Sequence, residues 1–387
     1  MRTALEILFW LSAALIVWTH AGYPLALGAL ARVRRSATRR TRPAAVEGSS
    51  PPSLSLIVAA HNEEAVIEAK VRNALALDYP RERLELIVAC DGCTDETAAR
   101  ARAAGAELVL ELPRAGKIRA QDLAVERARG EIVAFSDANA LWEADAAREL
   151  AGAFADPRVG YACGAVTFER ADGGRGAANQ EGVYWRYELA VRALESQLFS
   201  ITAGNGAIYA TRRDAYIVVD PIMGHDLSLP FNMVKRGYRA AYVPGARARE
   251  RMVPSLAGEF ARKRRMMSHT WPIVLRGGML SPRGYPLGYA LMMLSHRVLR
   301  YFTPVLHVIA LAANVALVAE GAGALYVVTL ALQLALLAAA LLAGTVRARP
   351  LLIARYYVLT TASPAAGLWD WLRHGTVAWW DAAEGTR

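Results

Sequence analysis

The stretch SLSLIVAAHNEE, residues 53–64, decides the fold. Its apolar run, Leu54–Ala60, stops abruptly at polar residues, and a second such run, residues 84–90, stops at DGCTD, residues 91–95. Neither run alternates between apolar and polar residues, and a helical pattern follows each, as expected of buried parallel strands. The sequence therefore predicts an α/β domain. Two shorter runs continue the series, at residues 108–112 and 132–135.

Polar residues follow the predicted strands where a ligand would be expected. Open parallel sheets bind ligands at the carboxyl ends of their strands, and here those ends carry residues 61–64, residues 91–95 and Asp137-Ala138-Asn139. An aspartate at such a place is often only a helix N-cap. Acidic residues after two strands also suit the joint binding of a divalent cation and a sugar nucleotide, because a departing diphosphate needs charge neutralisation.

An apolar segment precedes the predicted α/β domain. Between residues 7 and 31 only His20 can carry a charge, and this length is enough to span a bilayer. A cleaved signal peptide is the alternative, but the basic residues that follow favour a retained anchor with a cytoplasmic flank. We therefore predict a transmembrane helix over residues 1–31, a basic cytoplasmic linker over 32–52 and a water-soluble domain over 53–285. The basic residues are Arg32, Arg34, Arg35, Arg39, Arg40 and Arg42.

The C-terminal part of the chain is also apolar. Residues 301–319 and 324–344 are separated by a short turn at Glu320, which predicts a transmembrane hairpin over 301–344 with that turn outside. Residues 286–300 mix apolar and basic side chains, which predicts a helix lying in the membrane plane. For residues 345–387 we expect an interfacial or re-entrant helix and a C-terminal tail, with a fourth span as the alternative.

Composition limits the classes of protein. Hydrophobic residues make up 54% of the 387 residues and charged residues 21%, an apolar excess too large for a chain that is soluble throughout. Three cysteines cannot form a dense disulfide framework. The net charge of +10 indicates an anionic partner, and the apolar content favours anionic membrane lipid over nucleic acid.

The ordered motifs resemble the membrane-bound family 2 glycosyltransferases with a GT-A domain, in the branch of the cellulose, hyaluronan and poly-N-acetylglucosamine synthases. This resemblance implies a mixed, mostly parallel sheet in the 53–285 domain, with transmembrane and interfacial helices on both sides of it. It also implies a multi-pass protein of the plasma or inner membrane whose catalytic domain is cytoplasmic. The motifs are residues 55–63, residues 91–95, Gly116-Lys117, residues 130–133 with 137–139, residues 226–229, residues 184–188 and residues 206–213.

The resemblance implies a role for each matching residue. Asp91 matches the aspartate that contacts the nucleoside, Lys117 the lysine beside it, and Asp226 the general base for the acceptor hydroxyl. Asp137 matches the first residue of the Asp-x-Asp motif, which meets Mg²⁺ or Mn²⁺ and the diphosphate, and Asn139 stands at the third position as a weaker, neutral ligand. The remaining residues expected at the nucleotide sugar are Asn62, Glu63, Arg262 and Arg265.

One family motif is altered in this chain. Arg262 and Arg265 keep the two basic positions, but Met266 replaces the tryptophan that seats the acceptor sugar in polymerising members, and Trp271 is a possible substitute. The two arginines could instead form a juxtamembrane basic cluster that attracts anionic lipid.

These motifs give one main expectation and two alternatives. We expect inverting transfer of a sugar from a nucleotide diphosphate donor, a UDP-sugar first, to a growing polysaccharide or lipid-linked acceptor. The alternatives are addition of a single sugar to a polyprenyl phosphate or lipid-linked oligosaccharide, and a catalytically silent scaffold that binds nucleotide or polymer.

Several other signals are given simpler interpretations. We expect Glu188 and Glu195 to form a solvated stripe on one helix face and His225 to be a solvated loop residue. We expect no thiol chemistry from Cys90 and Cys93, because Cys90 ends a strand and the intervening aspartate fits the nucleotide role.

Overall fold

We describe the fold from a computed structural model, which describes residues 1–37, 50–169, 180–251, 256–346 and 348–379. The expected linker therefore lies largely outside the described residues, since Arg39, Arg40 and Arg42 fall between 38 and 49. The end of the C-terminal tail, residues 380–387, also lies outside them.

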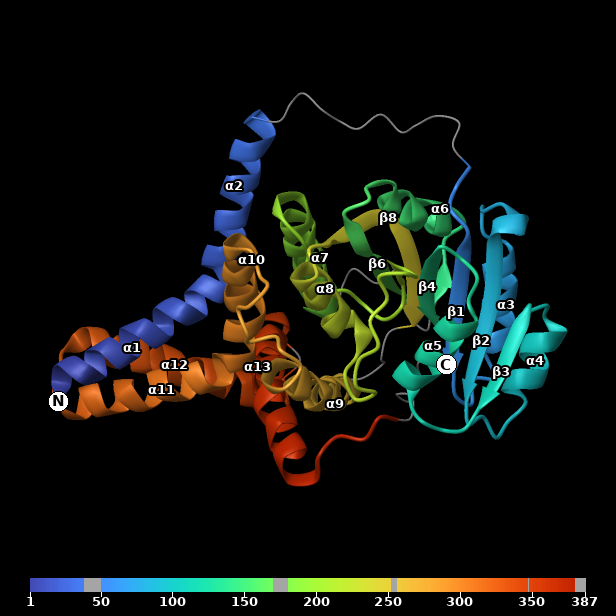
Figure 1. The fold of residues 1–387 in the computed structure, drawn as a ribbon. Helices are drawn as coiled ribbons and strands as arrows, with labels where there is room; N and C mark the ends of the chain where they lie inside the picture. The colour runs from blue at the N-terminus through green and yellow to red at the C-terminus, as the bar shows by residue number, and fades with distance from the viewer. Residues whose placement is uncertain (38–49, 170–179, 252–255, 347, 380–387) are drawn as a thin grey trace.

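A mixed eight-stranded sheet forms the centre of the α/β domain (Figure 1). In spatial order the strands are β3-β2-β1-β4-β7-β6-β8-β5. The first four are mutually parallel, β7 is antiparallel to β4 and β6, and β5 is antiparallel to β8. The strands are β1 Leu54–Ala60, β2 Leu84–Asp91, β3 Leu108–Leu112, β4 Ile132–Asp137, β5 Leu141–Trp142, β6 Val159–Glu169, β7 Tyr209–Arg212 and β8 Arg239–Arg251.

The parallel half of the sheet confirms the predicted strands. β1 lies in the middle, with β2 on one side and β4 on the other. Its last residues pair with Cys90 and with Asp137. Parallel strands end at the same edge of a sheet, so this register places Asp91 and Asp137 at one edge, on either side of β1.

Helices cover both faces of the sheet, so the domain has three layers. Because successive residues of a strand point to opposite faces, Leu56 and Val58 pack into one core and Ile57 into the other. The first core is closed by α3 Ile67–Leu75, α4 Thr97–Ala103 and α6 Ala146–Gly152. The second is closed by α5 Lys117–Arg127, α8 His225–Lys235 and α9 Leu256–Leu275.

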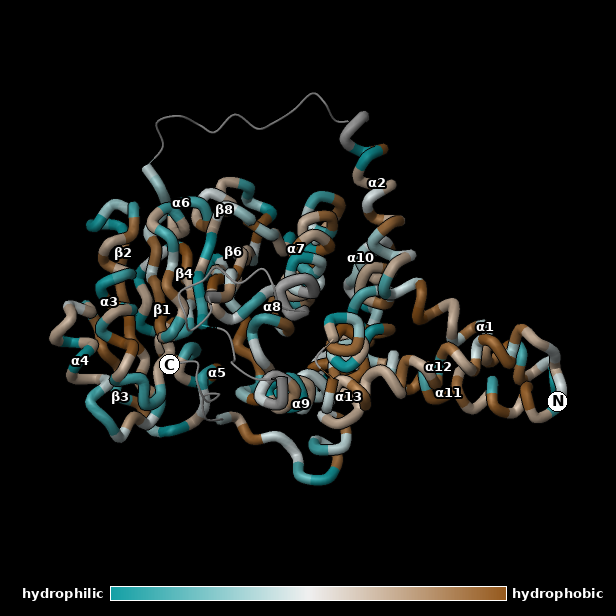
Figure 2. Tube along the Cα trace, turned by 180° about the vertical axis from the view of Figure 1, so that it is seen from behind, coloured by the Kyte–Doolittle hydropathy of each residue, from teal (hydrophilic) through white to brown (hydrophobic). Residues whose placement is uncertain are grey.

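Three long apolar helices extend away from the sheet, and Figures 1 and 2 show them side by side as a mostly hydrophobic bundle. By length and composition the described residues contain three helices that could cross a membrane, Arg2–Arg34, Leu287–Ala319 and Ala324–Leu342. The bundle itself is made by α1 Arg2–Val17, α11 Leu299–Ala319 and α12 Ala324–Leu342.

Two of the three candidate spans contain a π-helical segment, Arg2–Arg34 at Trp18–Gly22 and Leu287–Ala319 at Met293–Val298. The helical runs change direction there, so that α2 Tyr23–Ala37 and α10 Leu287–Met292 turn away from the bundle (Figure 1), as π-bulges often allow. The expected 1–31 helix is therefore bent rather than straight. The expected in-plane helix, 286–300, is continuous with the first helix of the hairpin.

The last helix, α13 Arg349–His374, packs along α9 and is not among the three candidate spans. The Trp271 indole donates to the carbonyl of Pro364 at 2.8 Å, and Arg264 forms an ion pair with Asp370 at 2.6 Å. These contacts attach α13 to the α/β domain. Its membrane placement, interfacial or spanning, stays a prediction.

Candidate active site

The loop before α5 is organised by Asp91, the last residue of β2. Its carboxylate accepts hydrogen bonds from the backbone N–H groups of Ala115, at 2.7 Å, and Gly116, at 3.0 Å. Gly116 has φ +95°, a left-handed conformation that favours glycine. Asp91 thus fixes the start of α5, whose first residue is Lys117.

Lys117 and Asp137 form an ion pair across the edge of the sheet. Burial disfavours the Lys117 ammonium, but the adjacent Asp137 outweighs that effect and holds the lysine pKa above its ordinary value. Gly206 lies against the pair, because a Cβ on it would be 3.2 Å from the Lys117 ammonium. A basic and an acidic group are therefore adjacent where a charged ligand can reach both.

The His61–Glu64 segment stabilises the neighbouring loop. The His61 ring nitrogen Nδ1 lies 2.6 Å from the carbonyl oxygen of Asp91, and the Thr94 backbone N–H donates to the Asn62 side chain at 2.8 Å. Asn62 has φ +51° and is not part of the cavity lining, whereas Glu63 is. In this structure Asn62 therefore supports the loop at residues 93–95 and does not line this cavity.

Asp226 lies in the first turn of α8, after Gly224 at the N-cap. Its backbone carbonyl accepts a hydrogen bond from Gly204 at 2.7 Å, which ties α8 to the loop before β7. Burial raises the pKa of the Asp226 carboxyl, although nearby Lys117 opposes the shift. A carboxylate with a raised pKa is a better proton acceptor than an ordinary one.

The expectation of a solvated His225 is wrong. His225 is 2% exposed and begins α8, directly before Asp226. Its ring lies 3.0 Å from the Tyr209 hydroxyl and 3.2 Å from the Tyr216 hydroxyl, which donates to Asp122. Burial lowers the pKa of His225 to about 3. The histidine is therefore neutral at physiological pH and anchors the first turn of α8.

Glu250, near the end of β8, was not identified from the sequence. It lines the same cavity as Asp137, and burial together with Asp137 raises the pKa of its carboxyl to about 7. Arg247, Arg249 and Arg251 surround it in the sequence, and such an alternation of charged residues is typical of a solvent-exposed strand. No motif signals it, because its proximity to Asp137 arises only from the order of strands in the sheet.

One cavity of about 960 Å³ brings the expected residues together. It is lined by residues of the sheet edge, by Asp226 and by residues of the helices α11 and α13. Met266 lines it, but Trp271 is buried against α13 and does not, so Trp271 does not replace the missing tryptophan here. The expected site residues that line the cavity are Glu63, Asp91, Lys117, Asp137, Asn139, Asp226, Arg262 and Arg265.

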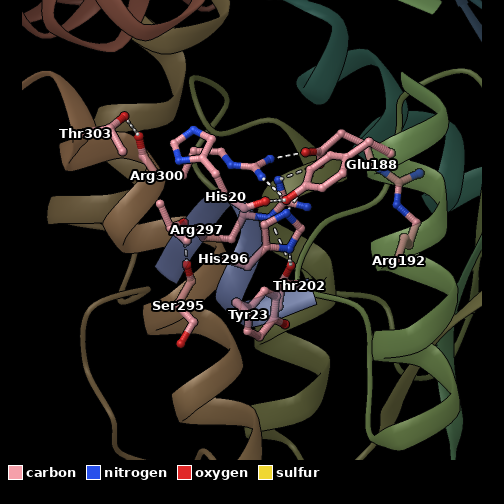
Figure 3. A network of polar contacts seen from close by, with 12 residues as sticks. His20, Tyr23, Glu188, Arg192, Thr202, Ser295, His296, Arg297, Arg300 and Thr303 are labelled. Atoms are coloured by element: carbon pink, nitrogen blue, oxygen red, sulfur yellow. Dashed lines mark hydrogen bonds and ion pairs between the residues drawn. The ribbon is translucent and has the colours of Figure 1, made fainter. Parts of the chain in front are cut away.

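A second expectation, of a solvated stripe on α7 Gln180–Leu198, is also wrong. Glu188 is 5% exposed and Glu195 is fully buried. Both face polar side chains from the apolar helices (Figure 3). A spacing of seven residues places both side chains on one helix face, but the spacing does not reveal which other element covers that face.

The sheet edge suits a divalent cation, provided that a ligand supplies part of the coordination. Asp137 and Asn139 present the carboxylate and amide oxygens that Mg²⁺ and Mn²⁺ prefer. Among the described residues no group of three acidic, histidine or cysteine side chains could hold a metal ion. The donor set is therefore incomplete without oxygens from a diphosphate or from water.

Residues 51–268 match the family model described as Glycosyltransferase like family 2, which covers more than half of the chain. The chain belongs to this family and is a glycosyltransferase.

Relatives in other organisms are enzymes of the same kind. A β-monoglucosyldiacylglycerol synthase from Synechocystis is 30% identical over 222 residues, 52% of this chain and 42% of the relative. An N-acetylglucosaminyltransferase from Azorhizobium caulinodans is 27% identical over 229 residues, 53% of this chain and 56% of the relative. The chain spans about half the length of these relatives.

A solved structure shows the same fold. A mannosyltransferase from Pyrobaculum calidifontis, solved with GDP-Man and Mn²⁺, is 24% identical with a TM-score of 0.67. The match covers 95% of this chain and 99% of that one. The likeness confirms the GT-A fold.

Proposed function

We propose that this glycosyltransferase transfers a sugar, with inversion, from a nucleotide diphosphate donor to an acceptor hydroxyl on a growing polysaccharide or a lipid-linked acceptor. The observation that carries the proposal is the single cavity that holds Asp91, Lys117 and Asp137 at the sheet edge and Asp226 further toward the membrane. A donor at the first three residues would present its sugar to the fourth.

Each residue then has a defined task. Asp91 fixes the loop over the nucleoside, and Lys117 with Arg262 and Arg265 neutralises the diphosphate. Asp226 accepts the proton of the acceptor hydroxyl while the oxygen of that hydroxyl forms a bond to the anomeric carbon. The bond from that carbon to the diphosphate oxygen breaks, and the nucleoside diphosphate leaves on the opposite face.

A divalent cation fits this arrangement. Asp137 and Asn139 would hold Mg²⁺ or Mn²⁺, and Asp137 is close enough to Glu250 to contribute to the raised pKa of that carboxyl. When bound, the cation would supply Lewis-acid stabilisation of the leaving diphosphate. The Mn²⁺ in the Pyrobaculum mannosyltransferase structure supports the proposal.

We also propose the arrangement in the membrane. Residues 1–31 and the 301–344 hairpin would span the plasma or inner membrane, and the 53–285 domain would be cytoplasmic. The 286–300 segment and residues 345–387 would lie at the interface, where the basic flanks meet anionic lipid. The three apolar helices of the bundle support this placement.

Single addition is the second candidate, and Met266 favours it. Met266 lines the cavity in the place where polymerising members carry tryptophan, and its flexible side chain is a poorer platform for a sugar ring. Incubating the purified full chain with labelled uridine and guanosine diphosphate sugars, followed by product analysis, tests both candidates. Release of nucleoside diphosphate with a singly glycosylated product supports single addition, and a ladder of products supports polymerisation.

A further inference from the structure

Two buried arginines line the cavity beyond Asp226. Arg192 of α7 is 3% exposed, and Arg297 of the Met293–Val298 segment is 8% exposed. Arg192 donates to the Gly204 carbonyl at 2.9 Å, and its guanidinium lies over the Trp185 and Tyr242 rings and contacts the Cys163 side chain. Its Nε and Nη1 atoms have no oxygen acceptor among the described residues. Arg297 donates to the Thr202 hydroxyl at 2.9 Å, and its Nη2 atom likewise lacks an acceptor there. Buried guanidinium groups are normally fully hydrogen-bonded.

The charges around the two arginines are unbalanced. Glu188 forms an ion pair with Arg300 and lies 3.8 Å from Arg297 (Figure 3). Glu195 is already occupied by other donors, since the Tyr23 hydroxyl and a His296 ring nitrogen each lie 2.7 Å from it. Arg300 holds the pKa of Glu188 well below its usual range despite burial, and His296 lowers the pKa of Glu195 despite burial. Within the described residues Glu188 and Glu195 are therefore already paired with Arg300, Arg297 and His296, and Arg192 forms no ion pair with either carboxylate.

The lining of the whole cavity has more basic than acidic side chains. Among the described residues, ten arginine and lysine side chains line it, against six aspartates and glutamates. Several of the basic groups lie at the sheet edge, where the donor diphosphate would neutralise them. Arg192 and Arg297 lie at the other end, where α11 and α13 provide Tyr301, Thr303 and Tyr357 as neighbouring walls.

A short loop connects this end of the cavity to the reaction centre. Thr202 contacts Arg297, and Gly204 contacts both Arg192 and the backbone of Asp226. Gly206 lies beside Lys117 and Asp137. An anion held by the arginines would therefore lie next to the same loop that positions the base.

We propose that Arg192 and Arg297 bind a phosphate group of the acceptor, and that the acceptor is a membrane lipid whose hydroxyl-bearing head group is attached through phosphate. This inference rests on the proposed function. Guanidinium groups form paired, charge-assisted hydrogen bonds with phosphate oxygens. The phosphate supplies the missing acceptors and the missing negative charge, and it anchors the lipid so that its hydroxyl reaches Asp226.

The test measures binding of a simple lipid phosphate. Decyl phosphate, decanol and inorganic phosphate are titrated into the full chain in a neutral detergent by isothermal titration calorimetry. We expect decyl phosphate to bind at least tenfold tighter than either of the others. Arg192→Met and Arg297→Met should each weaken it about tenfold or more, the size expected for charge-assisted hydrogen bonds.

Two variants guard against effects of misfolding or lost charge. Arg297→Met combined with Glu188→Gln removes one positive and one negative charge together, and it should lose decyl phosphate binding while still unfolding cooperatively. Arg158→Met removes an arginine from the surface, where it pairs with Asp156, and should bind decyl phosphate like the parent.

The outcomes separate the inference from the proposed function. Equal binding of decanol or of inorganic phosphate, or unchanged affinity in the arginine variants, would overturn the phosphate site even if sugar transfer is observed. Normal decyl phosphate binding without transfer from any nucleotide sugar would instead overturn the proposed function and leave the site in place.

Discussion

Lys117 and Asp137 form an ion pair at the sheet edge, and each side chain remains partly exposed to the cavity. The lysine comes from the start of α5 and the aspartate from the end of β4, on the two sides of β1. A diphosphate with its cation would meet both partners of the pair, the phosphate oxygens at Lys117 and the cation at Asp137. The pair thus holds two opposite charges ready for one ligand.

The first prediction concerns the cation. Turnover should require Mg²⁺ or Mn²⁺, and Asp137→Ala should weaken both donor binding and transfer, because the cation loses its only full carboxylate at that motif. Donor affinity by calorimetry, with and without metal, checks the first effect and product formation the second.

Asn139→Asp is the matched companion to this variant. An added carboxylate should tighten metal binding while transfer continues. Undiminished transfer by the parent chain in excess chelator would show that Asp137 has a different task.

The second prediction concerns pH. The pKa of Glu250 is raised to about 7, so this carboxyl ionises near neutrality and adds negative charge beside Asp137. Metal affinity should therefore rise between pH 6 and pH 8 in the parent and rise much less in Glu250→Gln. Metal titrations at several pH values measure the difference.

The same shift has a consequence for stability. The folded state binds the Glu250 proton more tightly than the unfolded state does. The contribution of this carboxyl to the free energy of unfolding is therefore complete below pH ~4.3 and is lost as pH rises to about 7. At pH 8 Glu250→Gln should consequently have a higher unfolding temperature than the parent, and at pH 4 it should not. Equal differences at both pH values would contradict the assigned protonation.

The third prediction concerns membrane topology. Single cysteines at Val33 and Val346, in a chain without Cys90, Cys93 and Cys163, should be protected from an impermeant thiol reagent in intact cells. A cysteine at Glu320, an exposed residue, should react. Glu320 is preferable to Gly321, whose φ of +68° disfavours a side chain. Labelling at Val33 in intact cells would reverse the proposed orientation.

The local features of the fold were predictable from the sequence. Leu54–Ala60 and Leu108–Leu112 are strands with the predicted bounds, because buried parallel strands are continuous apolar runs. The half of the sheet formed by β7, β6, β8 and β5 was implied only by the family resemblance, since β6 and β8 pair across about eighty residues of chain. The bends in the apolar helices depend on π-helical segments that hydropathy does not reveal.

The site was predictable where residues follow strands in a motif and unpredictable where they do not. Asp91 and Asp137 were located by the rule that ligands bind at strand ends. Glu188, Arg192 and Arg297 looked like ordinary helix residues, because their importance depends on α7 packing against the apolar helices. Glu250 was missed for the same reason, as its partner Asp137 is far away in the chain.

Asp226 is the residue on which the account depends most. In Asp226→Asn the side chain keeps its size but cannot accept a proton. If Asp226 only stabilised the N-terminus of α8, asparagine would replace it with little loss. The decisive measurement is the transfer rate of Asp226→Asn at saturating donor, together with its donor affinity. We predict a fall in rate of ~10²–10⁴ with nearly unchanged affinity. A rate close to that of the parent would contradict the assignment of Asp226 as the base.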